Sequence, residues 1–200
     1  RPFSIFERAL TQPTILLFYL SLLLYPAPSR LSLDHEVTTA TSYTDPWMTI
    51  PALFIIFLLI VISVLKYKKY ALISFALLFF FVNHLIESTV IPLEMIFEHR
   101  NYLPSFFLFL PVAYAFKRGI DYTASKYPLL NFSLKAFIPL LIIILGLGTY
   151  SRNAVWKTEE SLWTDCLRKA PGNARPYARL AEIYGWKKEK TEENFRTALA

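Results

Sequence analysis

The residues best suited to chemistry lie in one polar stretch, residues 83–105, between two strongly apolar parts of the chain. His84 and Glu87 are three positions apart, so they share one face at the end of a helix. Glu98, His99 and Arg100 follow in direct succession. Adjacent guanidinium and imidazole groups suit a phosphate, because charge-assisted N–H donors match its oxygens. The first hypothesis is that Arg100 and His99 bind an anionic headgroup such as a lipid-linked sugar phosphate, oriented by Glu98. His84 and Glu87 are further candidates for lipid-phosphate or substrate binding.

Two other interpretations of this stretch stay open. One is a divalent metal site, although the spacing of the ligands fits no recognised pattern. Its four ligands would be His84, Glu87, Glu98 and His99. The other is an external loop whose Glu–Arg pairs only cap helices. A weaker polar patch surrounds Arg30, and we expect a solvated loop there with Asp34 and His35 as site-lining residues.

The rest of the sequence carries few chemical signatures. It contains no phosphate-cradling glycine loop, no H-E-x-x-H, no G-x-S-x-G and no repeated cysteine pair. The single cysteine, Cys166, excludes an intrachain disulfide framework and a cysteine zinc cage. Cys166 occupies a small-residue helix contact, so we expect it to be buried and inert.

The elements that must position these residues are apolar helices. Hydrophobic residues make up 54% of the 200 residues and charged residues 18%, against roughly 25% charged in an ordinary globular chain. Five apolar stretches cover residues 13–25, 47–65, 70–86, 102–116 and 134–150. A soluble domain of this length cannot bury five such stretches, and aromatic residues flank them as at membrane interfaces. The expected fold is an all-α polytopic membrane bundle with five transmembrane helices.

The loop charges predict an orientation in the membrane. The segments expected on one side hold nine basic residues: Arg1, Arg8, Lys66, Lys68, Lys69, Lys117, Arg118, Lys126 and Lys135. The opposite loops hold two basic and six acidic residues. The positive-inside rule therefore predicts a cytoplasmic N-terminus in a cell inner membrane, with the C-terminal segment in the periplasm. The net charge of +6 is then a topology signal, and nucleic acid is not an expected partner.

The C-terminal part, residues 151–200, is polar and helical, and forms a second domain after the bundle of residues 1–150. We expect one helix over residues 157–169, a second over 175–184, a Lys/Glu-rich turn, and a third over 192–200. Tyr177, Leu180 and Tyr184 match the spacing of a tetratricopeptide-repeat opening, so they are candidate partner-binding residues. About three repeats are needed for a stable solenoid, which predicts that the chain is a piece of a longer protein.

Several motifs together resemble a known family. They are residues 10–12, residues 30–35, the block from Glu87 to Pro92, residues 97–105 (FEHRNYLPS), and Arg152-Asn153-x-x-Trp156 before the repeats. With the repeats, they resemble bacterial tetratricopeptide-repeat membrane proteins. These are similar to the eukaryotic transmembrane and tetratricopeptide-repeat O-mannosyltransferases of the GT-C glycosyltransferase superfamily.

The resemblance implies a membrane glycosyltransferase that uses a polyprenyl-phosphate-linked sugar as donor, with extracytoplasmic repeats that present the acceptor protein. It implies that Glu98, His99 and Arg100 line the lipid-phosphate pocket. It also implies that this chain is the C-terminal part of the family's bundle, so the catalytic carboxylate, which lies near the start of the full bundle, would be outside it. Asp34 and Glu36 do not form the family's acidic pair. No cofactor or metal is expected in the chain itself. The alternative function is a non-enzymatic membrane-anchored repeat scaffold for periplasmic or envelope protein assembly.

Overall fold

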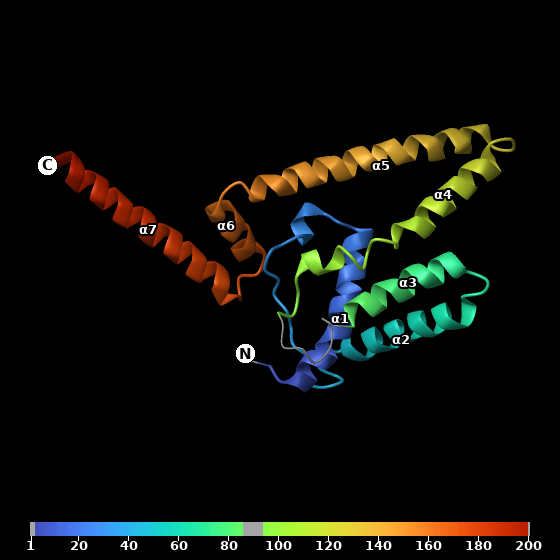
Figure 1. Ribbon diagram of the computed structural model, residues 1–200, viewed down its shortest axis with the longest axis horizontal. Helices are drawn as coiled ribbons and strands as arrows, with labels where there is room; N and C mark the ends of the chain where they lie inside the picture. Colours follow the sequence, from blue (N-terminus) through green and yellow to red (C-terminus); the bar gives the residue numbers. More distant parts are fainter. Residues whose placement is uncertain (1–2, 86–93, 200) are drawn as a thin grey trace. The chain divides into compact units, whose positions relative to one another are not determined.

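The computed structural model describes residues 3–85 and 94–199, and leaves aside the side chains of 186, 187 and 190–199. Within these residues the chain forms seven α-helices and no strand. The helices are α1 Ile5–Leu24, α2 Thr49–Lys66, α3 Ala71–His84, α4 Phe109–Thr123, α5 Pro128–Val155, α6 Glu159–Lys169 and α7 Ala174–Leu199 (Figure 1). Two short 3-10 helices, η1 Pro28–Arg30 and η2 Glu98–Asn101, lie in the connections.

The chain divides into two compact units. Unit 1 comprises residues 1–26 and 37–147, and unit 2 comprises residues 27–36 and 148–200. In unit 1, α2 packs against both α1 and α3, and α3 also contacts α4. The buried apolar side chains of unit 1 come mainly from one face of α1 and from α3: Leu10, Ile15, Leu16, Tyr19, Leu22, Ala76, Phe80 and Phe81.

The start of α1 is fixed by its own side chains. The Ser4 hydroxyl accepts a hydrogen bond from the Glu7 amide (3.2 Å), and the Glu7 carboxylate accepts one from the Ser4 amide (2.6 Å). This capping box satisfies two backbone donors that a helix start leaves free. The same hydrogen bonds hold the pKa of Glu7 below its ordinary value of 4.5. Arg8, expected in a solvated cytoplasmic segment, is instead 1% exposed in unit 1.

Two helices, α2 and α5, are long and apolar enough to cross a membrane. At 1.5 Å per residue, their 18 and 28 residues span about 27 and 42 Å. The apolar α3 is shorter, with 14 residues. The fourth apolar stretch is not one helix over residues 102–116. Residues 102–108 form turns, and the 15-residue α4 begins only at Phe109.

The C-terminal helices differ from the prediction. The expected helix over residues 157–169 is present as α6, which begins behind the capping residue Thr158. The expected turn after Tyr184 was wrong, because α7 runs without a break from Ala174 to Leu199. The residues from Trp186 to Lys190 are good helix formers without proline, and Gly185 alone does not end a helix.

Candidate functional site

The polar segment around η2 is anchored to α1 in unit 1. The Tyr19 hydroxyl accepts a hydrogen bond from the Phe97 amide (2.8 Å) and donates one to the Phe97 carbonyl (3.1 Å). Tyr19 is 2% exposed. About two turns earlier on α1, the side-chain amide of Gln12 lies 3.8 Å from the sulfur of Met95. Both backbone groups of Phe97 are therefore fixed before η2 begins.

The same segment is anchored to the end of α3. His84 is 2% exposed, and its Nε2–H donates to Oδ1 of the buried Asn101 at 3.2 Å. The His84 ring stacks on Tyr19 with centroids 5.4 Å apart and meets the edge of Phe80 at 4.6 Å. His84 thus lies inside unit 1 and joins α1, α3 and η2, where it holds the segment in place.

Of the two basic residues of the segment, His99 is exposed and Arg100 is half-buried. The Arg100 guanidinium lies 5.0 Å from the centroid of the Phe97 ring, and its Nη1 donates to the Glu94 carbonyl at 2.7 Å. The exposed His99 ring stacks on Phe97 with centroids 5.0 Å apart. Glu98 and Arg100 are half-buried. The Phe97 ring therefore gathers an imidazole and a guanidinium at one place, as phosphate recognition requires.

The remaining predicted residue of this site, Glu87, lies outside the described residues. Among the residues that the structure does describe, no three His, Cys, Asp or Glu side chains gather in a group that could hold a metal ion. The sequence did not single out Tyr19 or the contact of Asn101 with His84. Tyr19 stands in an apolar run, and no local pattern reveals that its hydroxyl reaches residue 97.

Unit 2 is built on the antiparallel pair α6 and α7. Its core holds Trp163, Cys166 and Leu180. Cys166 is free and fully buried, which confirms its predicted environment. Of the predicted partner-binding residues, Leu180 belongs to this core, while Tyr177 and Tyr184 are 53% and 51% exposed. The Tyr184 hydroxyl donates to the Glu160 carboxylate on α6 at 3.0 Å.

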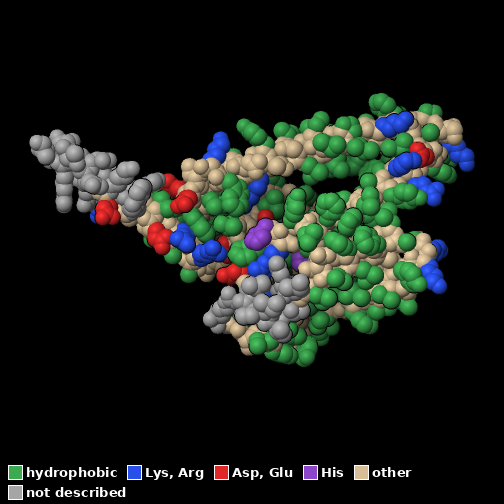
Figure 2. All heavy atoms as spheres, in the orientation of Figure 1, with side chains coloured by type: hydrophobic (Ala, Val, Ile, Leu, Met, Phe, Trp, Pro, Cys, Tyr) green, Lys and Arg blue, Asp and Glu red, His purple; other side chains and the backbone are tan. Residues whose placement is uncertain are grey.

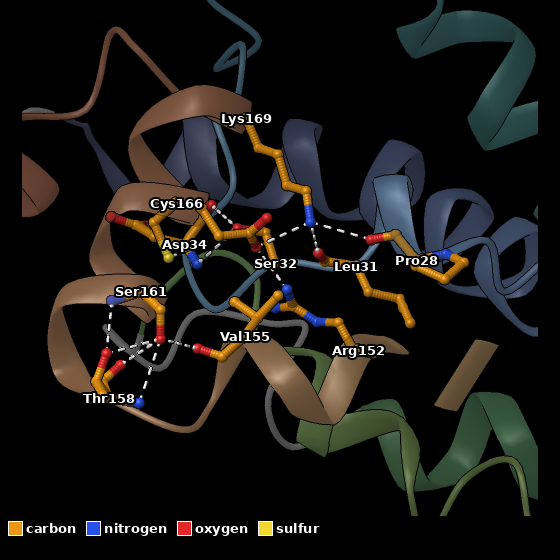
Figure 3. Close-up of polar contacts among 11 residues, drawn as sticks. Pro28, Leu31, Ser32, Asp34, Arg152, Val155, Thr158, Ser161, Cys166 and Lys169 are labelled. Carbon is orange, nitrogen blue, oxygen red and sulfur yellow. Dashed lines mark hydrogen bonds and ion pairs between the residues drawn. The ribbon is translucent and has the colours of Figure 1, made fainter. Parts of the chain in front are cut away.

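The loop segment 27–36 belongs to unit 2 and is bound to α6 by polar contacts (Figure 3). The Lys169 ammonium donates to the carbonyls of Pro28 (3.0 Å) and Leu31 (2.6 Å) and to the Asp165 carboxylate (2.9 Å). The Asp165 carboxylate also pairs with the guanidinium of the buried Arg152. The Asp165–Lys169 pair on α6 therefore joins the end of α5 to the loop.

Two further contacts complete the attachment of the loop. The buried Ser32 hydroxyl donates to the Asp34 carbonyl (2.8 Å) and lies 3.8 Å from the Cys166 sulfur. The Asn173 side-chain amide donates to the His35 carbonyl at 3.1 Å. Both Asp34 and His35 are half-buried. The loop that the sequence predicted as solvated is thus part of the core of unit 2.

Comparisons with models of protein families, with curated proteins and with solved structures found no match for this chain. The described residues form an all-helical chain in which two helices are long and apolar enough to cross a membrane.

Proposed function

We propose that this chain is part of a membrane glycosyltransferase that uses a polyprenyl-phosphate-linked sugar and acts on proteins at the extracytoplasmic face. The observation that carries the proposal is the anchored segment around Phe97. The Tyr19 hydroxyl holds the Phe97 backbone and the His84 ring holds the Asn101 side chain, while His99 is exposed and Arg100 is half-buried. A cationic loop fixed in this way is suited to a phosphate, because its backbone loses little conformational entropy on binding.

The membrane part of the proposal is supported by the exposure of the apolar helices. A helix that is apolar all round is stable only inside a large core or in a bilayer. In the apolar windows of α2 and α5, only 17% and 6% of residues are buried within the protein. Lipid is the environment that covers the remaining apolar surface. The five-helix bundle in a cell inner membrane, with a cytoplasmic N-terminus, is proposed on the same basis together with the loop charges.

The two chain segments that make up unit 2 support the proposed orientation in the membrane. Residues 27–36 and 148–200 form one compact unit, so they lie in the same compartment. The chain between them must then cross the bilayer an even number of times. Loop charges independently predict four crossings in that interval and a periplasmic position for both segments.

The test of donor binding uses polyprenyl phosphate added to the chain in lipid nanodiscs. Arg100→Ala removes a charge-assisted hydrogen-bond donor, worth about 1.5–3 kcal/mol, so affinity should fall by roughly 10-fold to 150-fold. Arg179→Ala, on the exposed face of α7, is the matched control and should leave affinity unchanged. Circular dichroism shows whether both variants keep their helices. Equal affinity in the two variants would remove Arg100 from the site.

The alternative function is a membrane-anchored scaffold that binds periplasmic proteins through its repeat-like helices. A groove of about 760 Å³ between α6 and α7 favours it, lined by Trp163, Ile183, three glutamates and Arg179. Polyprenyl-phosphate binding separates the two functions. Two results together would favour the scaffold. The chain would retain no polyprenyl phosphate, and it would capture a periplasmic protein that the Tyr177→Ala variant does not capture.

A further inference from the structure

The α4–α5 hairpin of unit 1 is closed at one end by a polar clamp. The side-chain amide of the buried Asn131 donates to the Ile120 carbonyl (2.6 Å) and to the Thr123 hydroxyl (3.0 Å). A Cβ added at Gly119 would lie 3.7 Å from Leu134, so the two helices approach closely there. Away from this end the helices diverge (Figure 1).

An apolar groove of about 380 Å³ lies between the diverging helices. Its α4 wall includes Val112, Ala113 and Phe116, and its α5 wall is formed by Ile138 and Leu141. Lys117 is the one charged residue that lines it. An apolar groove with a cation beside it has the chemistry of a site for an acyl chain with an anionic head.

The clamped end of the hairpin carries a strong positive charge. Lys117 and Arg118 lie near the end of α4, Lys126 lies in the turn, and Lys135 lies near the start of α5. Asp121 is the one acidic residue among them, and its carboxylate pairs with the Lys117 ammonium at 2.8 Å, on the exposed surface of α4. Blue atoms gather at this end of the hairpin in Figure 2, with little red between them. All four basic side chains are exposed.

Aromatic rings accompany these cations. The Arg118 guanidinium lies over the Tyr114 ring at 5.6 Å and donates from Nε to the Tyr114 hydroxyl at 3.1 Å. The Lys126 ammonium lies 5.7 Å from the Tyr122 ring. Tyrosine and basic side chains together are typical of the level where lipid headgroups meet water.

We propose that the α4–α5 groove binds one acyl chain of an anionic glycerophospholipid of the cytoplasmic leaflet, with the lipid phosphate at Lys117 and Arg118. The inference rests on the membrane orientation in the proposed function. Basic pockets between membrane helices on the cytoplasmic side bind such headgroups, which supplies the charge complementarity. This lipid site differs from the proposed site for the sugar donor. Arg100 lies before the start of α4, whereas Lys117 and Arg118 lie near its end.

The experiment places the full chain in nanodiscs that contain equal amounts of phosphatidylglycerol and phosphatidylcholine. The protein is then released from the nanodiscs, and native mass spectrometry counts the lipids that stay bound to it. The wild-type chain should retain phosphatidylglycerol in preference to phosphatidylcholine. The double variant Lys117→Gln, Arg118→Gln should lower that retention about 25-fold, since each of the two cations placed at the lipid phosphate contributes about fivefold. Ala113→Trp fills the groove and should abolish retention.

The matched control is Lys66→Gln with Lys68→Gln, which removes two charges at the end of α2, away from the groove, and should leave retention unchanged. The charge variants lie on the exposed surface, so they test the site even where Ala113→Trp does not fold. Equal retention of both lipids, an equal loss in the control, or a lipid-free dimer overturns the proposal. Displacement of phosphatidylglycerol by polyprenyl phosphate in an Arg100→Ala background also overturns it.

The same experiment separates this inference from the proposed function. A chain that inserts and binds polyprenyl phosphate, but retains no anionic phospholipid, overturns only the lipid groove. A chain that does not insert into nanodiscs overturns the membrane orientation, and the lipid groove with it.

Discussion

The Tyr19 hydroxyl links α1 to the cationic segment through both backbone groups of Phe97. Tyr19→Phe keeps the ring and its stacking on His84, but leaves the half-buried Phe97 amide without its acceptor. The expected cost is about 1–3 kcal/mol of folding free energy, together with weaker polyprenyl-phosphate binding. Thermal unfolding and a nanodisc binding titration measure the two effects. Tyr150→Phe, at a 77% exposed tyrosine, is the control and should change neither.

Lys169 is the residue on which the attachment of the 27–36 loop depends most. Lys169→Met keeps a long apolar stem but removes three hydrogen bonds, two of them to backbone carbonyls. We expect a loss of about 1–3 kcal/mol in the stability of unit 2 and faster proteolysis within residues 27–36. The neighbouring Arg168 is exposed, so Arg168→Met is the control. Equal proteolysis of the two variants would contradict the role of Lys169.

At the scale of the elements, a substitution in α7 tests the turn after Tyr184, which the sequence predicted and the structure lacks. Gly185 lies inside α7, and a Cβ added there meets nothing within 4 Å. Gly185→Ala should therefore stabilise the helix by about 1 kcal/mol, because alanine has the higher helix propensity. A turn at this position would give the opposite sign. Denaturant unfolding followed by circular dichroism measures the change, with the exposed Ala181→Gly as the reciprocal control.

The helices were predictable to the extent that their own residues determine them. Uninterrupted apolar residues marked α2 and most of α5, and the amphipathic stripe ended by Pro171 and Gly172 marked α6. The error in α7 arose because a charged run was interpreted as a turn, although Lys and Glu favour helices. The partners of Tyr19 and Lys169 could not be predicted, because they lie 78 and up to 141 positions away along the chain.

At the scale of the whole molecule, unit 2 joins residues 27–36 to residues 148–200, which predicts that these two segments lie on the same side of the membrane. In a chain with Cys166→Ala, cysteines introduced at Ser29 and at Gly172 should react with an impermeant thiol reagent from the same side of the membrane. The physical reason is that the Lys169 ammonium binds carbonyls of the 27–36 loop. Periplasmic labelling of both agrees with the loop charges. Labelling from opposite sides would contradict both the unit and the even number of crossings.

The separation of Pro28 from Lys169, 141 positions along the chain, also bears on how the protein is made. At 5–20 residues per second, a ribosome needs on the order of ten seconds to reach Lys169 after Pro28 has been synthesised. During that interval the loop has emerged without its partner, and α2, α3, α4 and α5 are synthesised first. Unit 2 therefore completes its core only after these four helices have been made.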